Sequence, residues 1–153
     1  MEFAIILPVL LLMTLGMIDL GRAFVFGVAT QQGAREAARY ASRYAVSKAT
    51  VTDDLVRQRL IDASFPSLQG CDATLSTPQD CGGGTWTFTL TVTPTSGTSY
   101  SSIATAASNS NLSGGQVTVT ANGGVAMLGG VCLGQNLCLA SIGVQGQASM
   151  EII

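Results

Sequence analysis

The stretch FAIILPVLLLMTLGMI, residues 3–18, decides how this chain folds. It contains no charged residue and is bounded by Glu2 and Asp19. As an α-helix rising about 1.5 Å per residue it would be about 24 Å long, slightly short of a hydrocarbon core of about 30 Å. The stretch therefore predicts a helix that anchors the chain in a membrane.

The helical pattern continues from residue 19 to about residue 48, where alanine is frequent and proline is absent. We expect one helix over residues 2–48, about 70 Å long. Proline lacks the N–H that the helix needs, so we expect a kink or a melted turn at Pro8. The helical repeat places Arg35, Arg39 and Arg43 on one basic stripe. It places small side chains on another side of the helix, which we call the narrow side: Ala34, Ala37, Ala38, Ala41 and Ala45.

Residues 50–65 predict a second, shorter helix. Thr50 or Thr52 suits its N-cap, and two acids, Asp53 and Asp54, suit its first turn. We expect it to bury an apolar side and to end before Pro66 and Gly70; the apolar side consists of Leu55, Leu60 and Ile61.

The remainder of the chain predicts β-structure. Apolar and polar residues alternate over 85–93, 116–121 and 141–152, as in strands with one buried face. Residues 95–115 are rich in Ser, Thr and Gly and predict a solvated loop. The expected fold is α+β: a long N-terminal helix, a short second helix and a small antiparallel sheet, whose cover is the alanine-rich half of the long helix and the short helix.

Composition argues against most enzymatic functions. The chain has no histidine, which removes the usual general base and the usual metal ligand. Asp53 and Asp54 are adjacent and point different ways from a helix. We find no catalytic set, no phosphate loop and no metal cluster, and we expect no cofactor. A net charge of -2 does not indicate nucleic acid as a partner.

The four cysteines fall in two close pairs, Cys71 with Cys81 and Cys132 with Cys138. Their intervals do not suit a zinc site. Four cysteines allow three pairings, and we favour the sequential one. Because disulfides persist outside the cytosol, we expect this half of the chain to be extracytoplasmic.

Two simpler explanations of residues 3–18 remain open. Gly27-Val28-Ala29 offers a cleavage site to a signal peptide, but no basic segment precedes the apolar run and Asp19 and Arg22 follow it. An ordinary single-span anchor would place the residues after Arg22 in the cytoplasm, against the disulfide argument. The charge argument and the disulfide argument are compatible if a basic leader preceded residue 1 and was removed.

The segment MEFAIILPVLLLMTLGMIDLGRAF resembles the start of TadE-like pseudopilins, the minor pilins of tight-adherence pili. The resemblance rests on Glu2-Phe3-Ala4, Pro8, the leucine run, Gly16, Asp19, Gly21-Arg22 and Phe24, and on residues 34–41. It implies removal of a basic leader by a prepilin peptidase, storage in the inner membrane, and extrusion into or beneath a surface filament.

The resemblance also suggests assembly residues. Glu2 would pair with an N-terminal amine during assembly; the simpler alternative is an acid favoured by the helix dipole at the membrane surface. Pro8, Asp19 and Arg22 are further candidates, although Asp19 and Arg22 also suit the interfacial end of an anchor. Asn111-Leu112-Ser113 fits a glycosylation sequon.

We therefore expect residues 1–28 to form the anchor and filament core, and residues 29–153 an exported head. The predicted function is a structural subunit of a tight-adherence pilus, with identical subunits, the inner membrane, the peptidase and the assembly machinery as partners. Two alternatives are a minor pseudopilin that primes or tips the pilus, and a membrane-tethered binding module that uses residues 95–115.

Overall fold

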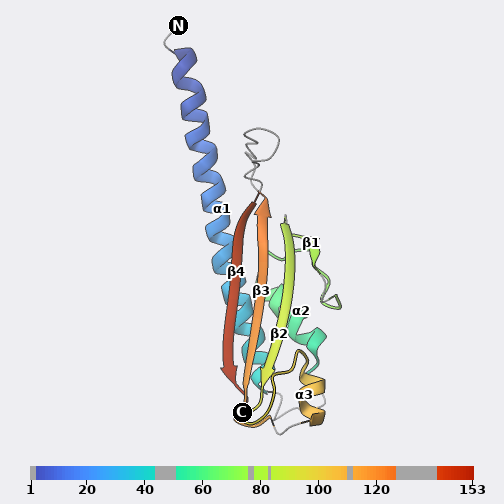
Figure 1. Ribbon diagram of the computed structural model, residues 1–153. Coiled ribbons are helices and arrows are strands. Elements are labelled where there is room, and N and C mark those ends of the chain that lie inside the picture. The colour runs from blue at the N-terminus through green and yellow to red at the C-terminus, as the bar shows by residue number, and fades with distance from the viewer. Residues whose placement is uncertain (1–2, 44–50, 76–77, 83, 110–111, 127–140) are drawn as a thin grey trace.

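The computed structural model describes residues 3–43, 51–75, 78–82, 84–109, 112–126 and 141–153 (Figure 1). A long N-terminal helix projects from a head that contains two short helices and a four-stranded sheet. This arrangement confirms the α+β prediction. The elements are α1 (Phe3–Ser42), α2 (Asp53–Ala63), β1 (Gln79–Cys81), β2 (Gly84–Thr93), α3 (Ile103–Asn109), β3 (Gln116–Ala126) and β4 (Ser141–Glu151).

Helix α1 is continuous over 40 residues, which corresponds to about 60 Å. The helix runs through Pro8, so of the kink or melted turn that we expected there, the melted turn does not form, and the kink stays a prediction. Proline at this position removes only one hydrogen bond of the ladder, and the following turns keep theirs. Within the described residues the helix extends to Ser42, and its predicted end near residue 48 lies in the range 44–50, outside the described part of the chain.

Helix α2 begins at the predicted cap, because the Thr52 hydroxyl accepts a hydrogen bond from the Leu55 N–H at 3.4 Å. Asp53 and Asp54 occupy its first turn. Its buried side consists of Val56, Leu60 and Ile61. The prediction for Leu55 was wrong: its side chain is 43% exposed, because Val56 shares a helix face with Leu60 and Leu55 does not.

The four strands form one antiparallel sheet in the order β1-β2-β3-β4. β2 and β4 agree with the predicted strands within a residue or so. β3 extends to Ala126, beyond the predicted end at residue 121. The added residues include Gly123, which lies opposite Trp86, and a side chain on Gly123 would overlap the Trp86 ring.

Residues 95–115 are not simply a loop, as we had predicted. They contain α3, whose Ile103 and Ala106 are buried, and Tyr100 forms a bridge with Val92. The Asp53 carboxylate accepts a hydrogen bond from the Ile103 N–H at 2.8 Å and so ties α3 to α2. The three-residue strand β1 was also not predicted.

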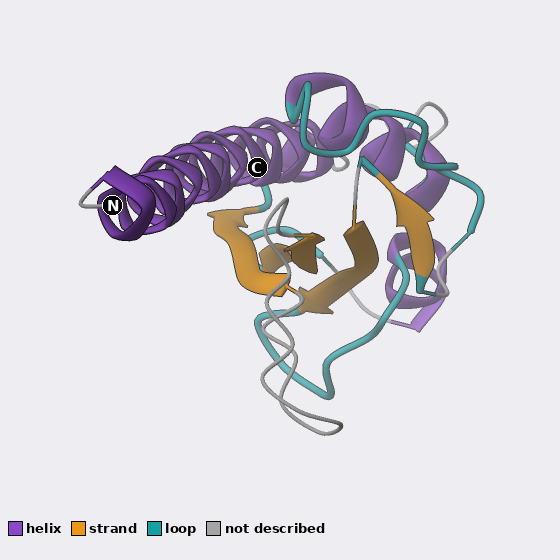
Figure 2. Ribbon diagram, turned by 90° about the horizontal axis from the view of Figure 1, so that it is seen from above, coloured by secondary structure: helices purple, strands orange, loops and turns teal. Residues whose placement is uncertain are grey.

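One face of the sheet is buried, as expected. Seen from above, α1 and α2 lie on the same side of the strands (Figure 2). On the narrow side of α1, Ala34, Ala37, Ala38 and Ala41 are fully buried, because alanine lets the helix approach the strands and α2 closely; Ala45 lies outside the described residues. The core includes Ala34, Ala37, Ala38 and Ala41 from α1, Val56 and Leu60 from α2, and Trp86, Phe88, Leu90, Val92, Val117, Val119 and Val144 from the sheet.

Candidate functional site: the apolar stalk and its junction with the head

The N-terminal half of α1 projects beyond the head (Figure 1). We call residues 6–28 the stalk, and the described residues from 29 onward the head. Among the described residues, thirteen large apolar side chains are exposed on the stalk and four on the head. The thirteen are Ile6, Leu7, Val9, Leu10, Leu11, Leu12, Met13, Met17, Ile18, Leu20, Phe24, Val25 and Val28.

This exposure distinguishes α1 from the core helix of a soluble protein. Over Ile6–Ser42 the helix is long and apolar enough to cross a membrane, and only 11% of its most apolar window is buried. Exposed apolar surface of this extent marks a contact with lipid or with another protein. The stalk is therefore the candidate functional site.

The stalk joins the head through close contacts along α1. Gly27 lies near Val144 of β4, where an added Cβ would sit 3.9 Å from the valine Cγ1. The buried Thr30 hydroxyl donates to the Phe26 carbonyl at 2.7 Å, and its oxygen lies 3.1 Å from the Ser67 hydroxyl oxygen. Gly33 lies against Leu60 and Ser64 at the end of α2. These contacts hold α1 between the sheet and α2.

Gln31 acts as a clamp on the edge strand β4. Its side-chain Nε2 donates to the Gln147 carbonyl at 2.8 Å, and its Oε1 accepts from the Gln147 N–H at 3.1 Å. The amide thus occupies the place of a neighbouring strand at this residue. Farther along, the Ile153 N–H donates to the Ser42 carbonyl at 3.1 Å. Sequence reasoning missed this clamp, because nothing in Gln31 itself indicates a partner 116 residues away.

The predicted assembly residues lie at different depths. Pro8 is exposed on the stalk, whereas Asp19 and Arg22 are partly buried. The Arg22 guanidinium carbon lies 5.9 Å from the centre of the Phe26 ring, so Arg22 packs along α1 by a cation–π contact. Glu2 lies outside the described residues, and its pairing with an amine stays a prediction.

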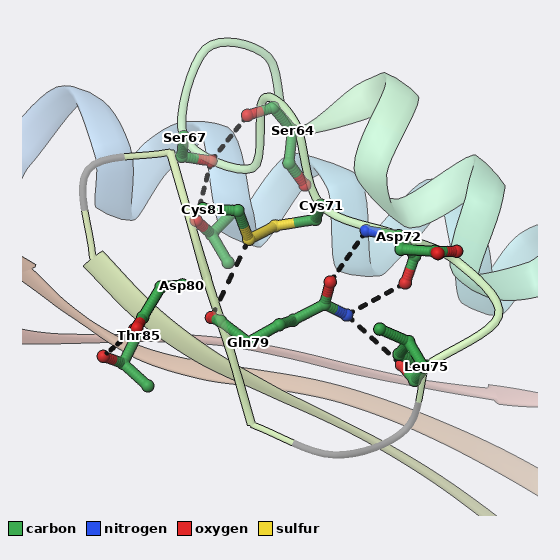
Figure 3. The surroundings of a disulfide bond; sticks show 10 residues. Ser64, Ser67, Cys71, Asp72, Leu75, Gln79, Asp80, Cys81 and Thr85 are labelled. Atoms are coloured by element: carbon green, nitrogen blue, oxygen red, sulfur yellow. Dashed lines mark hydrogen bonds between the residues drawn. A yellow bond between two sulfur atoms is a disulfide. The ribbon is translucent and has the colours of Figure 1, made fainter.

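A disulfide joins Cys71 and Cys81, the first of the two predicted pairs (Figure 3). The Cys132–Cys138 pair lies outside the described residues, as does Asn111 of the sequon. Gln79 lies inside the disulfide loop: its Oε1 accepts from the Asp72 N–H at 2.7 Å, and its Nε2 donates to the carbonyls of Asp72 and Leu75 at 2.9 and 3.2 Å.

Asp72 is also held by its own carboxylate. The backbone N–H and the hydroxyl of Thr74 donate to it at 2.8 and 2.7 Å. Because hydrogen bonds to the ionised form favour it, they lower the pKa of Asp72 below its ordinary value near 3.8. The disulfide loop thus presents a fixed, ionised carboxylate at the surface.

Within the described part of the chain, no group of three or more His, Cys, Asp or Glu side chains is placed to hold a metal ion. The arrangement that the structure does present is an exposed apolar helix joined to a head by close packing and hydrogen bonds.

The comparisons with known proteins agree with this picture at the N-terminus. The model of the family described as TadE-like protein matches residues 1–39, which include the whole stalk and the clamp residue Gln31. This match confirms the resemblance seen in the sequence. No curated protein and no solved structure matched the chain.

Proposed function

From the TadE-like character of its first 39 residues, we propose that this chain is a structural subunit of a tight-adherence pilus. The family match supports an association with such a pilus. The further step, that copies of this chain build the filament, is the proposal.

The observation that carries the proposal is the exposed stalk. Burying one large apolar side chain is worth about 1.5–3 kcal/mol, and thirteen are exposed together. Water is therefore a poor environment for the stalk. In the inner membrane lipid would cover it, and in a filament the stalks of neighbouring copies would take the place of lipid.

The two environments require different features of the stalk. For a bilayer, the uncharged residues 3–18 would form the anchor, with Asp19 and Arg22 at the interface. For a filament, stalks must pack side by side, and Gly16 and Gly21 leave open surface for a close neighbour, since nothing lies within 4 Å of a Cβ added there. A prepilin peptidase and the assembly machinery would act between the two states.

A second candidate is a minor pseudopilin that primes or tips the pilus without forming its shaft. The match to the TadE-like family favours it, because the resemblance implies minor subunits. Immunogold electron microscopy of sheared surface material distinguishes the two candidates. Label along the whole shaft supports the structural subunit, and label at filament ends or only in the membrane supports the minor pseudopilin.

The stalk itself is tested with a charged substitution. We expect Leu12→Arg to abolish filament formation, because arginine at the centre of an apolar helix costs about 2.5–3.5 kcal/mol on insertion. Leu55→Arg is the matched control, since Leu55 is also exposed but lies on α2 of the head. Equal filament yield from both variants would show that the stalk is not the assembly surface.

A further inference from the structure

Helix α1 carries a basic face along the head. Arg35, Arg39 and Arg43 are all exposed, and none forms an ion pair with a described residue. Glu36 and Glu151 flank these arginines and reduce the positive charge without cancelling it. The stalk does not explain this face, because it lies beyond the apolar segment.

A groove runs beside the basic face, between α1 and the edge strand β4. Phe24 and Val28 supply its apolar surface, with exposed fractions of 71% and 42%. Arg35 lies at its rim on α1, and Gln145 borders it on β4. The groove is continuous with the stalk, because Phe24 and Val28 belong to both.

The opposite side of the head is acidic. Asp62 at the end of α2, Asp72 in the disulfide loop and Asp80 on β1 are all exposed. Each accepts a hydrogen bond from a neutral side chain: from Gln58 at 3.0 Å, Thr74 at 2.7 Å and Thr85 at 2.6 Å respectively. These hydrogen bonds orient the three carboxylates. Two arginines of α2 lie nearby: Arg57 is paired with Asp54 at 3.0 Å, and the guanidinium carbon of the exposed Arg59 lies 5.3 Å from the centre of the Tyr40 ring on α1.

This acidic edge has apolar side chains of its own. Phe65 follows Asp62 by three residues and is 67% exposed, and Leu75 follows Asp72 by three residues and is 46% exposed. The disulfide and Gln79 hold the loop that carries Asp72 and Leu75 (Figure 3). Apolar side chains with a charged rim are the ordinary composition of a protein–protein interface.

The two surfaces lie on opposite sides of α1 and at the same level along it. Gly33 faces α2, beside Ser64, and Arg35 follows two residues later, about 200° around the helix. Phe24 and Arg35 line the groove, and Thr30, which is hydrogen-bonded to Ser67, lies between these two residues along α1. A neighbouring copy with little axial offset would thus bring its Phe65 to the level of the groove.

We propose that the acidic edge of one copy (Asp62, Phe65, Asp72 and Asp80) docks against the groove and basic face of a second copy. The contact is heterologous, since it joins two different surfaces. Repeated heterologous contacts build an open helical filament, or a ring where the rotation closes, rather than a two-fold dimer. This inference rests on the proposed function and adds to it a lateral contact between heads.

Anionic lipid is a poorer partner for the arginines. Arg35 lies 13 residues beyond Arg22, which is about 20 Å of helix, and Arg43 lies about 32 Å beyond it. At physiological ionic strength charges are screened over about 8 Å. With the stalk in the bilayer, the basic face is thus out of reach of headgroups but within reach of a neighbouring head.

Charge exchange between the two surfaces tests the contact in the full-length chain. We expect the double variant Arg35→Glu with Arg39→Glu to lower the yield of sheared filaments by about tenfold, and Asp62→Lys with Asp80→Lys to do the same, because attraction becomes repulsion at every repeat. Asp72 is left unchanged because it orders its own loop.

Restoration is the decisive result. A chain that carries all four substitutions, and a co-expressed mixture of the two double variants, should both regain filaments, because opposite charges meet again. The fluorescence of Trp86, the only tryptophan and a fully buried one, checks that each variant is folded.

Failure of this inference differs from failure of the proposed function. If the double variants form filaments as well as the parent while Leu12→Arg does not, the lateral contact is wrong and the stalk remains the assembly surface. If both double variants fail and neither the fourfold variant nor the mixture recovers, the charges do not face each other and the inference is overturned. If the parent forms no filament, the proposed function itself fails.

Discussion

Replacing Gly33 by alanine should destabilise the folded chain, although helix propensity alone predicts that it would stabilise it. Alanine is favoured over glycine in a helix by about 1 kcal/mol, so the substitution should stabilise an isolated α1. In the folded head, however, a Cβ on Gly33 would lie 2.7 Å from the Leu60 carbonyl oxygen and would overlap the Ser64 hydroxyl. Contacts this short require α2 to move away from α1.

The expected magnitude follows from these two opposing effects. Overpacking a closely fitted interface costs about 1–3 kcal/mol. The Ser64 hydroxyl cannot simply turn away without losing its bond to the Leu60 carbonyl, which is 2.6 Å long. After subtracting the propensity gain of about 1 kcal/mol, we expect Gly33→Ala to lower the free energy of unfolding by up to about 2 kcal/mol.

Guanidinium unfolding of the full-length chain in mild detergent measures this loss. Trp86 is the only tryptophan and is fully buried, so its fluorescence follows the head. Gly16→Ala is the matched control, because nothing lies within 4 Å of a Cβ added there, and it should leave the unfolding midpoint of the head unchanged. A Gly33→Ala midpoint equal to or above that of the parent would refute the close packing of α1 against α2.

Three further predictions concern the disulfide loop and the N-terminus. Replacing Cys71 and Cys81 by serine should lower the free energy of unfolding by about 2–3 kcal/mol, the loop-closure entropy for a separation of 10 residues; an unchanged unfolding midpoint would contradict it. The pKa of Asp72 is lower in the folded state than in the unfolded one. Its contribution to the free energy of unfolding is therefore complete above the unfolded value near 3.8 and is lost as pH falls through the folded value. Thr74→Val removes the hydroxyl donor and should weaken this acid sensitivity in pH-dependent unfolding, and an identical pH profile would rule the hydrogen bond out as its cause. Glu2→Leu should leave membrane insertion intact but reduce filament yield if the carboxylate sets subunit register, and normal filaments would leave only the helix-dipole role.

Local sequence patterns were sufficient for most of the secondary structure. The uncharged run of residues 3–18 and the alanine spacing predicted α1, and Thr52 with the acids behind it predicted the start of α2. Alternation predicted β2 and β4. These signals are strong because each repeats over several turns or residue pairs, and because in the head each helix or strand buries only one of its faces.

Prediction failed where the local signal is weak or absent. β3 was predicted too short, because Gly123 and Gly124 have no side chains to continue the alternation, although the Trp86 ring fills the space beside Gly123. Strand β1 has three residues, too few for a period. Within the Ser- and Thr-rich segment, α3 forms because the side chains of Ile103 and Ala106 are buried in the core.

The assembly surfaces depend on contacts between distant parts of the chain. The basic stripe was visible in the spacing of Arg35 and Arg39, but its position beside a groove was not. The groove lies between α1 and β4, which are joined by the hydrogen bonds of Gln31 to Gln147, 116 residues away. The acidic edge gathers Asp62, from a helix, with carboxylates of the disulfide loop and β1. Side-chain periodicity describes one element at a time, whereas the placement of these charges on opposite sides of α1 follows from how the elements pack.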